Sequence, residues 1–157
     1  MPNFTYCSLN IDGSKEDLER FLQENRSEQE DLDFYKSAPL DQDIHAADVW
    51  GTKWNAIEPY AEFQSNGEDD ETLHYHFQTA WDEPYGWFEI VAKKYPHLEF
   101  HIVFEDEAWL HCGEHEAFNG VVDYNKFSYG DKGFEIMYKN AEGEEEWENY
   151  VREREDG

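Results

Sequence analysis

The sequence predicts an α+β fold, and three observations support that prediction. Segments in which apolar and polar residues alternate, typical of half-buried strands, are interrupted by segments whose apolar residues recur at helical spacing. Aromatic residues make up 17% of the 157 residues and occur along the whole chain, so a substantial core can form. No repeat or flexible linker divides the chain, and we therefore expect one domain over residues 1–157.

The expected elements follow one another in the order strand, helix, strand, strand, helix, strand. Ser14 lies three residues before Asp17, which is the spacing of a helix N-cap. A strand is expected at 4–11, followed by a helix after Ser14 with Leu18, Phe21 and Leu22 on one face. Strands at 57–64 and 72–81 are joined by an Asn66-Gly67 turn. A helix through Trp87, Ile90, Val91 and Lys94 stops at Pro96, and the last strand of this series is expected at 98–104.

This βαββαβ order is that of the ferredoxin-like fold, an antiparallel sheet with helices on one face. Beyond it, residues 116–124 and 134–138 are predicted as extra strands. The chain then reads EGEEEWENYVRERE, where Trp147, Tyr150 and Val151 fall on one side of a helix and acidic residues cover the rest. Residues from about 126 to 157 are thus expected to form an acidic extension that ends in a docked helix.

The charge of the chain excludes several classes of partner. Its 38 acidic and 12 basic residues give a formal net charge of −26, which opposes direct binding to nucleic acids and to anionic membranes. No apolar run approaches the roughly 20 residues of a membrane span, and the start lacks the pattern of a signal peptide. Because two cysteines form no disulfide framework, we expect a cytoplasmic protein.

Several motifs together resemble one protein family. They are the MPNFTYCSLNIDG start with its following helix, the WGTKW of residues 50–54, the FQTAW of residues 77–81, and YPHLEF before an acidic strand end. Over residues 1–125 the chain resembles the YubB ferredoxin-like family, which plasmids, phages and related elements encode. The family's pattern often has two prolines after its second tryptophan, whereas Asp82-Glu83-Pro84 stands here. The resemblance implies a fold and a mobile-element origin, and no mechanism.

The WGTKW motif has two interpretations. Trp50 and Trp54 could form a stacking platform, with Lys53 meeting a phosphate or another anion. Alternatively, both rings pack in the core and Lys53 lies along an aromatic face. The second interpretation is favoured because no other basic cluster lies nearby in the sequence.

Histidines offer a second candidate site. His74 and His76 alternate on an expected strand, so both should project from one sheet face. His111 and His115 lie in HCGEH, and a zinc site assembled from the four histidines is conceivable. The spacing matches no established metal motif, however, and no cofactor or metal is predicted. The chain also lacks a nucleophile elbow, a phosphate loop and a dinucleotide fingerprint, so we expect no enzyme.

The acidic residues themselves are the remaining candidate. A rigid protein with carboxylates at phosphate-like spacing can occupy the basic groove of a nucleic-acid-binding protein. We therefore predict an acidic nucleic-acid mimic that inhibits a host restriction or CRISPR effector; a general acidic adaptor, or a histidine-based metal protein or enzyme, are the alternatives. The residues predicted to contact the partner are Glu68, Asp69, Asp70, Glu105, Asp106, Glu107, Glu142, Glu144, Glu145, Glu146, Glu148, Glu153 and Glu155.

Overall fold

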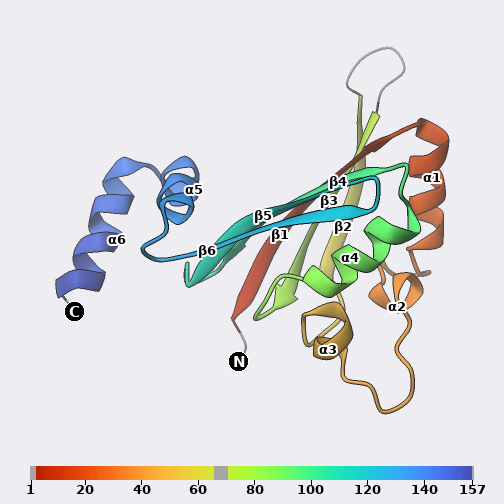
Figure 1. Cartoon of the computed structure of the whole chain (residues 1–157), viewed down its shortest axis with the longest axis horizontal. Coiled ribbons are helices and arrows are strands. Elements are labelled where there is room, and N and C mark those ends of the chain that lie inside the picture. Colours follow the sequence, from red (N-terminus) through yellow and green to blue (C-terminus); the bar gives the residue numbers. More distant parts are fainter. Residues whose placement is uncertain (1–2, 66–70, 157) are drawn as a thin grey trace.

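The computed structural model describes residues 3–65 and 71–156, and its centre is a six-stranded antiparallel sheet (Figure 1). The strands are β1 (Phe4–Gly13), β2 (Ile57–Ser65), β3 (Glu71–Ala80), β4 (Glu99–Asp106), β5 (His111–Phe118) and β6 (Val121–Ser128). The helices are α1 (Lys15–Glu24), α2 (Phe34–Ser37), α3 (Ala46–Trp50), α4 (Tyr85–Lys94), α5 (Lys132–Glu142) and α6 (Glu144–Asp156). In the sheet the strand order is β2-β3-β1-β4-β5-β6.

The predicted ferredoxin-like core is confirmed. Strands and helices of the βαββαβ plan appear close to their predicted bounds, with α2 and α3 added between α1 and β2. The Ser14 hydroxyl accepts a hydrogen bond from the Asp17 backbone N–H at 3.2 Å, which caps α1 as the sequence predicts. Acidic residues in the first turn of α1 and basic residues in the last turn of α4 also complement the helix dipoles.

Two predictions about the extra segments were wrong. Residues 134–138 form part of α5, because Phe134 and Tyr138, four residues apart, bury the same helix face. Residues 116–124 are not one strand, since Asn119 and Gly120 adopt positive φ angles and turn the chain between β5 and β6. The predicted Asn66-Gly67 turn lies outside the described residues.

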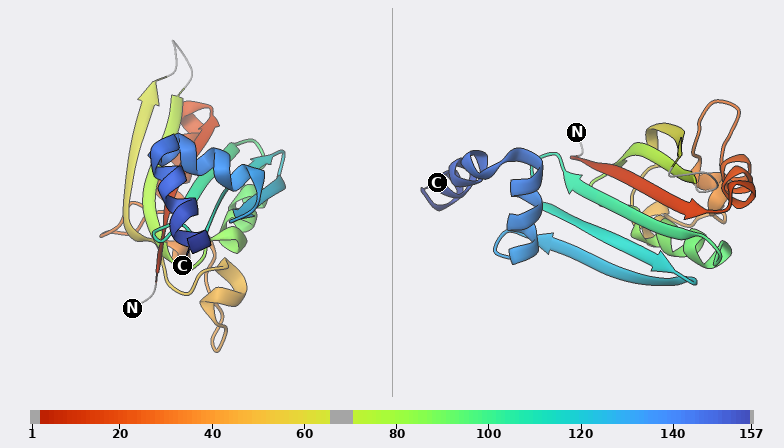
Figure 2. Two further views of the ribbon diagram at one scale, coloured as in Figure 1. Left: turned by 90° about the vertical axis from the view of Figure 1, so that its left-hand side faces the viewer. Right: turned by 90° about the horizontal axis from the view of Figure 1, so that it is seen from above.

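Helices cover the two faces of the sheet unequally. One face packs on α1 and α4, supported by α2 and α3, around the main core, where Phe21, Phe34, Trp50 and Trp87 are fully buried. Figure 2 shows α5 and α6 beyond one end of the strands, with α1 at the other end. At the end that carries α5 and α6, Phe134 and Tyr138 pack with Cys112 in a second, smaller cluster.

The apolar side of α6 was predicted correctly from the sequence. Trp147 and Tyr150 contact each other with ring centroids 5.7 Å apart, and both pack against Tyr138 of α5. The Tyr150 hydroxyl donates a hydrogen bond to the Trp109 carbonyl at 2.9 Å, which ties α6 to the turn between β4 and β5. The acidic helix is therefore held by aromatic contacts at one end of the sheet.

Candidate functional site

The face of the sheet opposite α1 and α4, here called the acidic face, is the most unusual surface of the protein. The strand register places one side chain of each strand in a continuous row, Glu62, His74, Asn10, His101, Glu116 and Asp123. Including the neighbouring rows, the strands bring seven carboxylates to this face, and none of its described positions holds Lys or Arg. These carboxylates belong to Asp12, Glu62, Glu99, Glu105, Glu114, Glu116 and Asp123.

The spacing of these carboxylates is set by the sheet. Neighbouring strands lie about 4.8 Å apart, and residues i and i+2 of one strand are separated by about 6.6 Å. Like charges at such distances repel each other by about 1 kcal/mol or less per pair in water. The array consequently presents a dense negative field on a rigid support, and a partner with the opposite charge would relieve this repulsion.

Histidines are the basic side chains of the acidic face. His101 Nε2 lies 3.1 Å from Glu114 Oε2 and 3.9 Å from Glu116 Oε1. On β3, the Nε2 atoms of His74 and His76 are 2.7 Å apart, close enough for one neutral ring to donate to the other. Burial, followed by the charge of His76, lowers the pKa of His74 below its ordinary value of 6.5. The neutral form of His74 is therefore favoured.

The acidic face also contains a groove of about 480 Å³ where it meets α5. Tyr6, Val103 and Glu105 of the sheet line it, together with Trp109 of the β4–β5 turn and Met137 of α5. Burial, followed by the negative charge of Glu142, raises the pKa of Glu105. Among the described residues, no hydrogen bond or ion pair satisfies the Glu105 carboxylate.

The residues predicted to contact a partner differ in their exposure. Those of the C-terminal segment are exposed on α6 or just before it, and Glu155 accepts a hydrogen bond from the Tyr129 hydroxyl at 3.2 Å. Asp106 is buried and accepts hydrogen bonds from two backbone N–H groups of the β4–β5 turn, so it stabilises that turn. Glu107 accepts a hydrogen bond from the Phe4 N–H at 3.0 Å. Glu68, Asp69 and Asp70 lie outside the described residues.

On the helix-covered face, one buried carboxylate is fully paired. Glu83 Oε2 lies 2.8 Å from His115 Nε2, and Glu83 Oε1 lies 2.8 Å from the Lys126 ammonium. His115 Nδ1 accepts a hydrogen bond from the Asn125 N–H, so its Nε2 carries the proton that it donates to Glu83. Burial alone would raise the pKa of Glu83, but these two partners lower it, and the carboxylate stays ionised.

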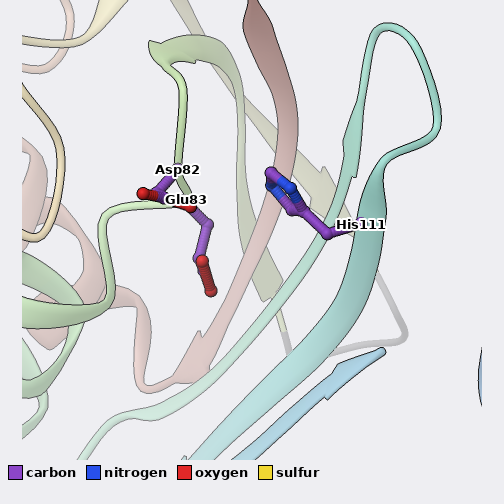
Figure 3. A group of neighbouring side chains, drawn as sticks. All are labelled: Asp82, Glu83 and His111. Atoms are coloured by element: carbon purple, nitrogen blue, oxygen red, sulfur yellow. The ribbon is translucent and has the colours of Figure 1, made fainter. Parts of the chain in front are cut away.

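Figure 3 shows His111 reaching from β5 toward Asp82 and Glu83. Ligand atoms of the three residues lie within 4.8 Å of one another, which by itself would suit a metal ion. However, the Lys126 ammonium is 3.1 Å from Asp82 and 2.8 Å from Glu83, so a cation is already present between the two carboxylates. A metal ion would have to displace it, and this cluster is better explained as an ion-pair network of the fold.

The loop that carries Glu83 is held in place by threonines. The hydroxyls of Thr5, Thr52 and Thr79 donate hydrogen bonds of 2.7–2.8 Å to three successive carbonyls, those of residues 80–82. This restraint keeps Trp81 at a φ of 68°, a strained angle for a bulky residue. The tight loop thus fixes both the buried carboxylate and an exposed indole.

Neither interpretation of the WGTKW motif holds for both rings, since Trp50 lies in the core and Trp54 does not. Trp50 is fully buried and its indole N–H donates to the Ala38 carbonyl at 2.8 Å, as the core interpretation requires. Trp54 is 44% exposed, and its ring lies 5.9 Å from the Lys53 ammonium. It lines a shallow cavity together with Trp81. The structure therefore forms no platform from Trp50 and Trp54.

The prediction that His74 and His76 share one sheet face is confirmed. His111 and His115, however, project from the opposite, helix-covered face of the same sheet. Since a two-sided sheet separates the two pairs, the four histidines cannot form one metal site. The described groups with three possible ligands are the Figure 3 cluster and His101, Glu114 and Glu116.

Comparison with known proteins places the chain in a family. The model of the ferredoxin-like domain in Api92-like proteins matches residues 60–152, more than half of the chain. The chain belongs to this family. The match includes α5 and extends into α6 as far as residue 152, so this part of the C-terminal segment, which the YubB resemblance left out, belongs to the family's domain. The family is therefore ferredoxin-like, as expected, but it is that of the Api92-like proteins.

One similar solved structure is the crystal structure of Api92 from Yersinia pseudotuberculosis. It is 13% identical, with a TM-score of 0.40 over 60% of this chain and 34% of that one. The chain thus spans about a third of the length of that Api92-like protein. A search of curated proteins finds no match. No helix in the described part of the chain has the length and hydropathy needed to cross a membrane.

Sequence reasoning missed the sheet-wide carboxylate row and the Glu83 network. The alternation of each strand assigns its own acids to a face, but the register between strands cannot be read from alternation alone. For Glu83, the available indication was a carboxylate placed between a tryptophan and a proline in an aromatic segment. Its partners Lys126 and His115 are far away in sequence.

Proposed function

We propose that the protein is a non-enzymatic acidic inhibitor that binds a basic nucleic-acid-binding surface of another protein with its acidic face. The observation that carries the proposal is the array of seven carboxylates without a described Lys or Arg among them. Duplex DNA presents one phosphate charge per ~1.7 Å of its axis, and proteins that bind it align cationic side chains with that charge. A carboxylate array on a sheet presents negative charge to the same cations.

The physical reason for assigning a function to this face is its effect on stability. Like charges that are not balanced by Lys or Arg repel one another and destabilise a compact fold, so the excess of carboxylates on this face does not serve the fold itself. Folding needs the alternate, apolar residues of the same strands, such as Leu9 and Ile102, which are buried on the other face. Polar uncharged residues at the outward positions would leave the sheet intact. Retaining charge there is best explained by binding.

The exposed acids of α6 extend the proposed surface. Glu144, Glu145, Glu146 and Glu148 point to solvent, while Trp147 fixes the helix to α5. The partner class is a restriction or CRISPR-type effector in the cytoplasm of a host cell, in keeping with the mobile-element origin that the YubB resemblance implies. Such effectors hold nucleic acids in basic channels.

The test compares two variants that carry the same charge. In the row variant, Glu62→Gln, Glu116→Gln and Asp123→Asn neutralise one row of the acidic face. In the control variant, Glu16→Gln, Glu19→Gln and Glu28→Gln neutralise exposed acids on and after α1, which packs on the other face. Proteins retained from a bacterial lysate by wild type and control, but not by the row variant, are the candidate targets.

Each candidate is then purified and loaded with a short fluorescent DNA duplex. The proposal expects wild type and the control variant to displace the duplex, and the row variant to displace it weakly, as measured by fluorescence anisotropy. Binding without displacement would replace mimicry by the function of a general acidic adaptor. Equal retention by both variants would contradict a role for the acidic face.

A second candidate function, binding of a divalent cation, is favoured by His101, Glu114 and Glu116, whose ligand atoms lie within 4.8 Å of one another. Imidazole and carboxylates from two paired strands suit zinc or a similar ion. Calorimetry with zinc, on wild type and on His101→Ala, tests it directly. Stoichiometric binding that the variant loses would support a metal-dependent protein; heat that is equal in both would exclude this site.

A further inference from the structure

The groove between the acidic face and α5 has the size and walls of a binding site for a side chain. Its volume of about 480 Å³ falls within the range of small-ligand pockets. Tyr6, which is 43% exposed, and Trp109 supply aromatic surface, while Val103 and Met137 supply aliphatic surface. The shape alone would accept many apolar groups, so the charges in the groove decide the class of ligand.

The described residues that line the groove include two carboxylates and one histidine, His76. Glu105 and Glu114 both line the groove, and Glu114 is hydrogen-bonded to His101 outside it. Glu105 is half-buried, has no partner among the described residues, and carries a raised pKa because of burial and the nearby Glu142. A partly desolvated carboxylate without a partner is unfavourable, and a cation in the groove would remove that penalty.

Contacts within the protein hold Trp109, one of the lining residues, in place. Asp106 accepts hydrogen bonds from the Ala108 and Leu110 N–H groups at 2.8 and 3.2 Å, which shapes the β4–β5 turn. The turn holds Trp109 at a φ of 54°, and its ring packs 4.7 Å from that of Tyr138. Preformed walls reduce the entropy lost on binding, which favours a specific contact over a diffuse ionic one.

We propose that this groove binds an arginine side chain of the basic partner; the inference rests on the proposed function and specifies its central contact. A guanidinium stacks on aromatic rings with its plane and forms two parallel hydrogen bonds to a carboxylate with its edge. The groove offers both surfaces together, Tyr6 and Trp109 as rings and Glu105 as carboxylate. A lysine ammonium would use the charge but not the stacking geometry.

The experiment titrates the full-length protein with Nα-acetyl-arginine methylamide and follows amide and indole resonances by NMR. The lysine and citrulline analogues are the matched probes, since one keeps the charge and the other keeps the shape. We expect saturable shifts at Tyr6, Trp109 and Met137, binding of lysine about fivefold weaker, and no binding of citrulline. Glu105→Gln should weaken arginine binding about fivefold or more.

The matched comparison for Glu105→Gln is Glu99→Gln, which removes an exposed carboxylate of β4 from the opposite end of the acidic face. It should bind arginine as wild type does, and both variants should keep the wild-type spectrum before titration. Shifts that spread over the whole face, or equal binding of arginine and lysine, would overturn the inference. So would an equal effect of Glu99→Gln and Glu105→Gln.

Failure here can be told apart from failure of the proposed function. If the row variant loses its partner while arginine does not bind the groove, the acidic face still binds and the groove does not. If the row variant keeps its partner as the control variant does, the proposed function falls, whatever the groove binds.

Discussion

Carboxylates on the two faces of the sheet lie in opposite environments. On the helix-covered face, Glu83 is 1% exposed and is held by His115 and Lys126 at 2.8 Å each. On the acidic face, seven carboxylates lie at strand spacing, and histidines are the basic side chains among them. The buried charge is balanced by a cation of the fold, whereas the carboxylates of the acidic face have hydrogen-bond partners such as His101 but no described Lys or Arg beside them.

This difference separates stability from binding. Removing a buried charge that is paired with a cation should strongly destabilise the protein, while neutralising carboxylates that have no Lys or Arg beside them should leave the fold intact or stabilise it. Any loss that follows from the second kind of change must then concern a partner. The predictions below test that separation, beginning with the largest expected effect.

Replacing Glu83 by alanine should cost about 3–5 kcal/mol of the free energy of unfolding, because it leaves the buried His115 N–H without an acceptor and Lys126 without its nearest carboxylate. Urea unfolding measures the change. The comparison is Asp82→Asn, at a half-exposed site that also contacts Lys126, which should cost less than about 1 kcal/mol. Similar costs for both variants would show that burial does not distinguish them.

Replacing Trp147 by alanine should cost about 2 kcal/mol, less than for a fully buried tryptophan, because the ring is partly exposed against Tyr138 and Tyr150. Thermal unfolding and the helical signal in circular dichroism measure the loss of α6 packing. The companion variant, with Gln at residues 144, 145, 146 and 148, should cost less than about 1 kcal/mol, since it removes only the acids that complement the dipole in the first turn of α6. If the companion variant unfolds as Trp147→Ala does, the acids of α6 belong to the fold.

Lowering the pH from 7.5 to 5.5 should reduce stability. Burial, followed by His76, lowers the pKa of His74, and burial, followed by Lys126, lowers that of His111. A depressed histidine pKa contributes stability that is fully present above the unfolded value of 6.5 and is lost as the pH falls through the folded value. Urea midpoints across this range measure the effect.

The two histidines allow the pH effect to be divided between the faces. His74→Gln should remove the part of the pH dependence that arises on the acidic face. His111→Gln should remove the part that arises on the helix-covered face. A pH dependence that neither variant changes would place its origin in other groups.

Neutralising the acidic row should have the smallest effect on stability. The row variant is expected to gain a few tenths of a kcal/mol at low salt, because it relieves repulsion between neighbouring strands, and the gain should vanish at high salt. Melting temperatures at two salt concentrations measure it. A loss of more than about 1 kcal/mol would mean that the row stabilises the sheet, and the separation between the faces would fail.

The elements of the core could be predicted because each has a local cause. Ser14 is followed by an acidic first turn, and Pro96 lies just beyond the last turn of α4. Residues 134–138 were mistaken for a strand because a short apolar run fits the periodicity of a strand and that of a helix equally well. The contact of Phe134 in α5 with Trp147 in α6 favours the helix. Such contacts are not visible in local periodicity.

The candidate site was predictable in its chemistry and not in its place. The excess of acids indicated a negative surface, and α6 carries part of it as predicted. The row across β2 to β6 depends on register, which joins residues as distant as Glu62 and Asp123 through four intervening strands. Asp106 was predicted to contact a partner because it lies in a run of acids, but its carboxylate accepts the hydrogen bonds that shape the β4–β5 turn.

The affinity of wild type, the row variant and the control variant for a captured basic partner, measured at rising salt concentrations, tests the central claim most directly. The two variants have the same net charge, so they differ in the face that lost it. Three surface charges at about 0.5 kcal/mol each predict an affinity about tenfold weaker for the row variant at low salt, and near wild-type affinity for the control. Equal losses in both variants would show that total charge attracts the partner, and would contradict a binding role for the acidic face.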